Sequence, residues 1–504
     1  MATEPGTLNA EHLITERSSY RQIFKATSLF GGVQIFNILI GIVRVKLVAV
    51  LLGTAGVGIL GLLNAPLNLI MSITGLGIAF SAVRDVAEAH NSGDLKKISS
   101  VIRTLRRWSW FTGLLGAVLT ISFAPLLSKW TFGTGEYTWA FVWLSITLVL
   151  QAISKGQSAL LQGTRRLKEM AKSGVIGSAL GLVTSIPLYY WYGIKGIVPA
   201  MIITTVTGLF LSWYFSRRII IEKAELTFKE TYTSGLGMAR LGIYMTLAGF
   251  VASLSAYLLN AFISNRGGIE QVGLYNAGWG IVGQYTGLIF AAMATDYFPR
   301  LSAIQADDNR VKDLVRQQAE TAVLIMSPLL ALLIITMPFV IRILYTSAFL
   351  PVVMFANLTV LGMQFKAISW AMGYVYLAKG NGRLFMTMEL IAGTVILFLN
   401  LIFYHFFDLN GLGISFILTY LFGVVFSYIV LRSRYDFSLP GQFFRNLSIT
   451  YGFTLLSFLT IFIHDIISRY LAGIIVFVLA AIFSFIKLNE FLDLKSYLIG
   501  KIKR

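Results

Sequence analysis

Fourteen long apolar runs follow one another along the 504-residue chain, and they constrain its fold more than any other feature. A helix that crosses a bilayer needs roughly 20 consecutive, mainly apolar residues, and it satisfies its backbone groups internally. The runs therefore predict an all-α polytopic membrane protein with fourteen transmembrane (TM) segments. They cover residues 26–51, 56–81, 109–128, 137–161, 173–191, 194–216, 240–263, 270–296, 319–345, 350–377, 384–404, 411–431, 447–463 and 470–487.

The basic residues set the expected orientation of these segments. Of the 41 Lys and Arg residues, 30 fall in the N-terminal lead-in, the alternate loops and the C-terminal tail, three fall in the remaining loops, and eight fall within the bounds of the spans, some of them at a span's edge. Loops on the cytoplasmic side of a membrane are enriched in Lys and Arg. The alternation therefore predicts an even number of spans, with both termini in the cytoplasm.

Composition argues against several other classes of protein. The chain is only 13% charged, whereas soluble domains carry about 25% charged residues. It has no cysteine, which excludes disulfides and thiolate chemistry, and its four histidines stand apart, so no metal site is predicted. The net charge of +18 is explained by basic loops that meet anionic lipid head groups, so membrane lipids and not nucleic acid are the expected contacts. Because the chain lacks a GxxxxGK[ST] motif, neither ATP hydrolysis nor a bound cofactor is predicted.

The sequence also repeats features at a spacing of 215 residues. The matching glycines are Gly53 with Gly268, Gly58 with Gly273 and Gly196 with Gly411. Six spans separate equivalent points, so the repeat predicts two six-helix lobes of equal orientation, related by a pseudo-twofold axis along the membrane normal. The alternative is that glycines were placed independently at loop edges. The predicted organisation is an N-lobe at 1–216, a cytoplasmic linker at 217–239, a C-lobe at 240–434, and two further spans with a cytoplasmic tail at 435–504.

Three segments resemble a known family of membrane proteins. Residues 44–58, RVKLVAVLLGTAGVG, resemble the end of the first helix in the flippases for O-antigen and enterobacterial common antigen, the Wzx group. Residues 272–278, VGLYNAG, and 291–302, AAMATDYFPRLS, resemble the eighth helix of the wider superfamily, which also contains lipid II flippases and multidrug extruders. The resemblance covers residues 20–435. Several relatives end after twelve helices, whereas this chain continues to fourteen, as the lipid II flippases do.

This resemblance implies a transporter and not an enzyme. It implies that the protein moves a polyprenyl-diphosphate-linked oligosaccharide, such as an O-antigen repeat unit, from the cytoplasmic to the outer leaflet of the bacterial inner membrane. The implied mechanism is alternating access of a cationic central cavity, and a polysaccharide polymerase is a candidate partner. The alternatives are an ion-coupled multidrug or cation antiporter of the same superfamily and a lipid II-type flippase.

Two lysines are candidates for lining the cavity. A charged side chain at the centre of a membrane costs at least ~2.5–3.5 kcal/mol, so it is rare without a wet cavity or a partner. Lys366 lies about sixteen residues into the predicted span 350–377, far from both interfaces. Lys155 shares a polar helix face with Gln151. The alternatives are a partner on another helix for Lys366 and snorkelling to the cytoplasmic interface for Lys155.

Polar residues on other spans complete the predicted substrate site. Arg44 shares a face of the first span with Gln34 and Asn37. Amide side chains offer donors and acceptors that suit sugar hydroxyls, although they also form hydrogen bonds between membrane helices. The further amide candidates are Asn64, Asn68, Asn276, Gln284 and Gln364.

One acidic residue is the candidate for ion coupling. Membrane-embedded carboxylates mark proton and cation pathways. Glu389 lies roughly five residues inside the predicted span 384–404. It is therefore the predicted site for proton or sodium coupling, if the transport is coupled to an ion.

Overall fold

The computed structural model describes residues 5–219 and 227–492, with most side chains from residue 36 onward. Within these ranges the chain forms thirteen α-helices and three short 3-10 helices, without a β-strand. The predicted all-α fold class is confirmed. Each of the fourteen apolar runs lies on a helix, although some runs extend a few residues beyond its ends.

Eight helical stretches of the described chain are long and apolar enough to cross a membrane. Two of them, Leu167–Ser216 and Gly382–Tyr435, are long enough for two crossings, because a helix rises about 1.5 Å per residue and the hydrocarbon core is about 30 Å thick. The exact number of fourteen crossings therefore stays a prediction. The eight stretches are Phe36–Thr74, Lys96–Phe132, Thr138–Gly163, Leu167–Ser216, Asp308–Leu344, Ser347–Ala378, Gly382–Tyr435 and Ile466–Glu490.

Two of the longest helices are each interrupted once. Helix α1 (Pro5–Thr74) is broken at Gly53, whose φ of 67° is a left-handed value that glycine adopts readily. Helix α11 (Gly382–Tyr435) is broken at Asp408, with a φ of 49°. Both breaks fall between predicted spans, so each helix consists of two segments.

The second predicted span, 56–81, ends earlier than expected. Helix α1 stops at Thr74, and a turn with positive φ at Leu76 and Gly77 leads into a separate helix, α2 (Ile78–Asn91). One face of α2 is buried through Ile78, Ala82 and Val86. The apolar residues after Thr74 therefore belong to an amphipathic helix that packs against its neighbours, and apolar content alone did not distinguish them from the end of a span.

The chain divides into two compact units. The first contains residues 1–52 and 63–250. In it α4 packs against α2, α3 and α6, and α5 packs against α6. Trp108 of α3 donates from Nε1 to the carbonyl oxygen of Thr231, which ties α3 to the start of α7. The helices not yet introduced are α3 (Leu95–Phe132), α4 (Thr138–Gly163), α5 (Leu167–Tyr192), α6 (Ile197–Ser216) and α7 (Phe228–Gly267).

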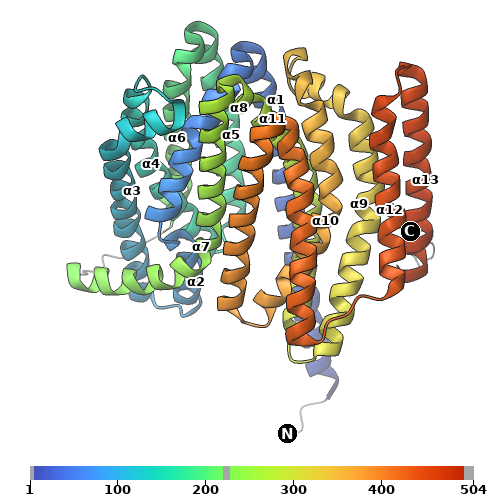
Figure 1. Cartoon of the computed structure of the whole chain (residues 1–504). Helices are drawn as coiled ribbons and strands as arrows, with labels where there is room; N and C mark the ends of the chain where they lie inside the picture. Colours follow the sequence, from blue (N-terminus) through green and yellow to red (C-terminus); the bar gives the residue numbers. More distant parts are fainter. Residues whose placement is uncertain (1–4, 220–226, 493–504) are drawn as a thin grey trace. The chain divides into compact units, whose positions relative to one another are not determined.

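The second unit contains residues 53–62 and 251–504. Helix α10 lies at its centre and packs against α8, α9 and α11, while α12 and α13 pack against α9 (Figure 1). The helices not yet introduced are α8 (Ile269–Ala303), α9 (Asp308–Leu344), α10 (Val353–Ala378), α12 (Gly441–Leu459) and α13 (Ile466–Leu492).

A reciprocal contact within the second unit follows the 215-residue spacing. A Cβ atom on Gly58 would lie 2.1 Å from the carbonyl oxygen of Ile269, and one on Gly273 would lie 2.0 Å from that of Thr54. Gly58 and Gly273 differ by 215 residues, as do Thr54 and Ile269. A larger side chain at either glycine would collide with backbone, which explains why both positions hold glycine. The twofold relation of whole lobes stays a prediction.

Candidate functional site

Lys366 lies at the middle of the central helix of the second unit. It is thirteen residues from the first residue of α10 and twelve from the last, so each helix end is about 18–20 Å away. The residues on either side of it in α10 are mostly buried, whereas Lys366 itself is half-buried. Its ammonium group therefore cannot reach either end of the helix.

Four aromatic rings surround the ammonium group of Lys366, and we call them the aromatic cage. The lysine Nζ lies 5.6 Å from the ring centroid of Trp279, 5.5 Å from that of Phe290, 5.9 Å from that of Phe416 and 5.5 Å from that of Tyr420. Among the described residues, no carboxylate forms an ion pair with this lysine. The cage offers the cation electron-rich ring faces in place of an acid.

Local helix geometry brings the rings of the cage together. Trp279 and Phe290 are eleven residues apart on α8, which is close to three helical turns and places them on one face. Phe416 and Tyr420 are four apart on α11, with ring centroids 4.6 Å apart. The ring of Phe416 also lies 5.6 Å from that of Trp279, so the two helices present their aromatic faces to each other.

Two cavities adjoin this cage in the second unit. One, of about 420 Å³, is lined by Lys366, Glu389 and Tyr420, and the other, of about 460 Å³, is lined by Trp279, Glu389 and Tyr420. Each falls in the range of about 300–1,000 Å³ that is typical of small-molecule sites. Glu389 therefore lies where the two cavities meet.

The structure thus brings Lys366 and Glu389, predicted separately, to one cavity. Within the described part of the chain, Glu389 has neither an ion pair nor a hydrogen bond. The hydroxyl of Thr419 lines both cavities and is buried without a hydrogen-bond partner. The cavity therefore offers a cation, a carboxylate, a hydroxyl and aromatic faces, a set suited to an anionic and hydroxyl-rich ligand.

The sequence did not reveal the cage or Thr419 as parts of the site. Aromatic residues of membrane proteins usually belong to the interfacial belts, which is the reading that composition favours. A signal was present in the spacing of four between Phe416 and Tyr420 in the middle of a predicted span. That spacing defines a shared face but leaves open which helix the face contacts.

The predicted site residues of the first unit differ in how far they are buried. Arg44 and Asn37 are both partly buried on α1, and the amide oxygen of Asn37 is buried without a hydrogen-bond partner. The side chain of Gln34 lies outside the described residues. On α4, Lys155 is exposed and Gln151 is partly buried. Their roles in substrate binding stay predictions.

The remaining amides fall into two groups. Asn64, Asn68 and Gln284 are exposed. Asn276 donates to the Asn260 side-chain oxygen at 3.1 Å, which links α8 to α7. The interhelical alternative therefore describes Asn276 in this conformation, while the roles of the three exposed amides in substrate binding stay predictions.

Gln364 is also engaged between helices. It is fully buried, and its Nε2 donates to the Thr454 hydroxyl at 2.7 Å and to the Thr450 carbonyl oxygen at 3.2 Å. Although it lies two residues before Lys366, it joins α10 to α12 and does not line the cavity that contains Lys366. Residues two apart on a helix point in different directions, which explains the difference.

A family model and a flippase of known function both match this chain. The family model described as "Polysaccharide biosynthesis protein" matches residues 47–354. The "Lipid III flippase" of Escherichia coli (strain K12) is 21% identical over 372 residues, which is 71% of this chain and 85% of that relative.

Two solved structures share the fold. "Lipid II flippase MurJ, inward closed conformation" has a TM-score of 0.67 at 15% identity, over 92% of this chain and 99% of that one. An inward-facing "multidrug resistance MATE family transporter of the MOP superfamily" has a TM-score of 0.66 at 15% identity, over 79% and 94% respectively. At these identities the likeness concerns the fold alone.

Proposed function

The chain belongs to the polysaccharide biosynthesis protein family, and from this premise we propose that it is a flippase for a polyprenyl-diphosphate-linked oligosaccharide. The observation that carries the proposal is Lys366, a cation at the middle of a membrane helix that faces a cavity without an acidic partner within ion-pair distance in the described chain. The weak relationship to a lipid III flippase supports the same substrate class.

The physical task of such a protein is to shield a head group. The polyprenyl tail is apolar and can stay in the lipid, whereas two phosphates and a glycan cannot cross about 30 Å of hydrocarbon unaided. A cavity that supplies cations for the diphosphate and hydroxyl or amide groups for the sugars removes this barrier. No covalent chemistry is required, so the protein acts as a transporter and not as an enzyme.

Each type of side chain would have a role that follows from its chemistry. Lys366 would neutralise the diphosphate, with Lys155 and Arg44 as further cations for the substrate. The rings of Trp279 and Tyr420 would stack on sugar faces, since aromatic rings present large apolar surfaces. The amides of Gln151, Asn37, Asn64, Asn68 and Gln284 would exchange hydrogen bonds with sugar hydroxyls as the cavity opens first to the cytoplasm and then to the outer side.

Glu389 is proposed to couple transport to an ion. It lies seven residues into α11, about 10 Å along the helix, where a lone carboxylate is costly unless it binds a proton or a cation. In the cavity of Lys366 the ionised carboxylate of Glu389 would compete with the diphosphate for the lysine, and a proton or cation bound at Glu389 would remove that competition.

The expected setting follows from the same proposal. The protein would reside in the bacterial inner membrane with both termini in the cytoplasm. It would receive the lipid-linked repeat unit at the inner leaflet and release it to a polysaccharide polymerase on the outer side. An O-antigen-like repeat unit is the proposed glycan.

The test is transbilayer movement of a fluorescent polyprenyl-diphosphate oligosaccharide in proteoliposomes. Movement that requires the protein, and that exceeds the movement of lipid II in the same vesicles, would support the proposed substrate. Movement of lipid II alone would favour a lipid II-type flippase. Gradient-driven efflux of small organic cations, with no lipid movement, would contradict the proposal and indicate a multidrug antiporter.

A further inference from the structure

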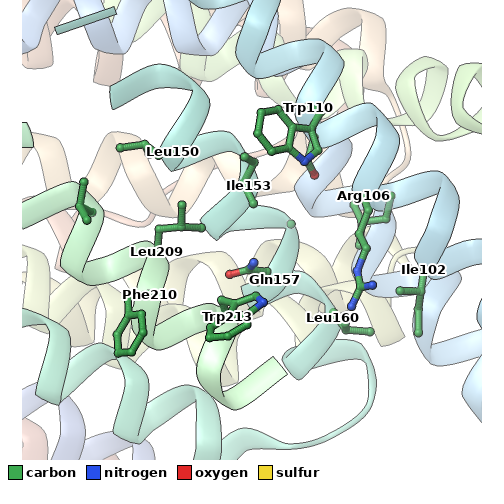
Figure 2. A pocket seen from close by; sticks show the side chains of 14 residues that line it. Ile102, Arg106, Trp110, Leu150, Ile153, Gln157, Leu160, Leu209, Phe210 and Trp213 are labelled. Carbon is green, nitrogen blue, oxygen red and sulfur yellow. The ribbon is translucent and has the colours of Figure 1, made fainter. Parts of the chain in front are cut away.

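A third cavity lies in the first unit, and none of its lining residues belongs to the proposed substrate site. We call it the α3–α4–α6 groove; it has a volume of about 530 Å³. Each helix contributes one face, because the lining residues on each recur at intervals of three or four. The lining residues are Ile102, Leu105, Arg106, Ser109 and Trp110 of α3, Leu150, Ile153, Gly156, Gln157 and Leu160 of α4, and Val206, Leu209, Phe210 and Trp213 of α6 (Figure 2).

The close approach of α3 and α4 forms one wall of the groove. A Cβ atom on Gly156 would lie 2.3 Å from the Ser109 hydroxyl, so glycine at this position lets the two helices approach without moving the serine side chain. Next to it, the Ser212 hydroxyl donates to the side-chain oxygen of Gln157. This bond holds the amide in place and leaves its NH₂ group as a donor, since the described residues provide no acceptor for it.

Arg106 gives the groove a positive charge at one end. In Figure 2 its guanidinium lies beside Ile102 and Leu160, across the groove from Leu150 and Leu209. No carboxylate lines the groove, and in the described parts of the chain Arg106 has no ion pair.

A second guanidinium contacts one of the lining residues without itself lining the groove. Arg217 stacks 4.8 Å from the ring centroid of Trp213, which lines the groove. The lining of the groove therefore combines one cation, Arg106, with the amide donor of Gln157, whereas the rest of the lining is almost entirely apolar. A ligand that matches this pattern has an anionic head and a hydrocarbon chain.

The groove opens on the outside of the helices. Trp110, Phe210 and Trp213 keep 53%, 58% and 45% of their surface exposed. Trp residues concentrate at the level of lipid head groups. From Leu160, near the end of α4, to Leu150 the groove extends along about 15 Å of helix, a depth that acyl chains occupy.

We propose that the α3–α4–α6 groove is a binding site for an anionic phospholipid. The phosphate binds Arg106 and the Gln157 amide, and one acyl chain lies along Ile153 and Leu209 towards Leu150. The ends of α4 and α6 are expected on the cytoplasmic side, so the lipid belongs to the inner leaflet. A polyprenyl diphosphate shares this chemistry, but its head group has to reach the cavity of Lys366, which none of these residues lines.

Photolabelling of the full-length protein tests this site directly. The protein is reconstituted in phosphatidylethanolamine vesicles with a trace of phosphatidylglycerol that carries a diazirine on its acyl chain, and labelled peptides are quantified. Labelling is expected within residues 150–160 and 206–213. Arg106→Gln should lower it at least five-fold, because a charge-assisted contact to phosphate is lost. Ile153→Trp should lower it similarly by filling the groove while keeping the charge.

Matched controls separate the site from general charge effects. Arg300→Gln removes a basic residue of α8 that is paired with Asp296 and should leave the labelling unchanged. Equal labelling in wild type and Arg106→Gln, or equal labelling by a diazirine phosphatidylethanolamine, would overturn the proposal. So would complete displacement by an equimolar polyprenyl diphosphate, which would assign the groove to the substrate. Labelling does not depend on flipping, so this test stands apart from the proposed function.

Discussion

Replacing Lys366 by Met removes the positive charge that faces the second-unit cavity while it keeps an unbranched, flexible side chain. The aromatic cage can close around a methionine, because a thioether makes favourable contacts with ring edges. We expect Lys366→Met to fold normally and to lose most of its transport of lipid-linked oligosaccharide. This combination distinguishes a binding cation from a residue that only supports the fold.

The expected loss of head-group binding and the expected change in stability both follow from the surroundings of Lys366. A hydrogen bond to a charged group contributes about 1.5–3 kcal/mol, so its loss weakens head-group binding by about 10- to 150-fold. For stability, a lysine at mid-membrane costs about 2.5–3.5 kcal/mol, and four cation–π contacts of about 0.5–1 kcal/mol each offset about 2–4 kcal/mol of that. These terms nearly cancel, so the substitution should change the free energy of unfolding by only about 1 kcal/mol.

The assay combines transport and stability on the same preparation. Initial rates of outward movement of a fluorescent polyprenyl-diphosphate oligosaccharide are measured in proteoliposomes at subsaturating substrate, and thermal unfolding is followed in detergent. Lys366→Met should lower the rate at least ten-fold with a nearly unchanged melting temperature. Lys366→Arg should retain part of the rate, because guanidinium binds both phosphate and aromatic faces. Lys195→Met, an exposed lysine in the turn before α6, serves as the matched control.

Two results would refute this reasoning. Wild-type transport by Lys366→Met would show that the charge does not bind the head group. A loss of more than about 3 kcal/mol of stability would show that the aromatic cage holds the lysine as a structural element, because the cation–π contribution would then exceed the penalty it offsets.

Three further predictions concern other parts of the chain. Gln364→Leu should lower stability by about 0.5–1.5 kcal/mol through the lost hydrogen bonds to α12, and thermal unfolding should detect this while the transport rate of the remaining folded protein stays unchanged. Glu389→Gln should keep substrate binding but abolish acceleration by an imposed proton or sodium gradient, and continued acceleration would rule out Glu389 as the coupling site. Hydrogen bonds from Thr227 lower the pKa of Glu230 at the start of α7, so its stabilising effect should be complete above the ordinary pKa of 4.5 and fade as the pH falls through the lowered value. Melting temperatures of wild type and Glu230→Gln should therefore differ at pH 7 and converge in acid, and a constant difference would contradict the capping role.

The sequence by itself determined the features that depend on one segment at a time. An apolar run of sufficient length must form a helix in lipid, so all fourteen runs lie on helices. The break expected near Gly53 is present because glycine accepts the left-handed backbone that ends the segment there. The periodic spacing of Lys155 with Gln151, and of Phe416 with Tyr420, fixed which residues share a helix face.

Only the tertiary structure decided which faces meet. Lys366 and Glu389 belong to different helices, and nothing local in either segment states that they line one cavity. The same holds for Gln364, whose amide contacts α12 about 90 residues further along the chain. The physical reason is that lipid solvates apolar helix faces nearly as well as protein does, so helix pairing depends on side-chain shape, small residues and polar contacts that exist only after packing. Hydrophobic periodicity identifies a polar or aromatic face, but the partner of that face is a property of the assembled bundle.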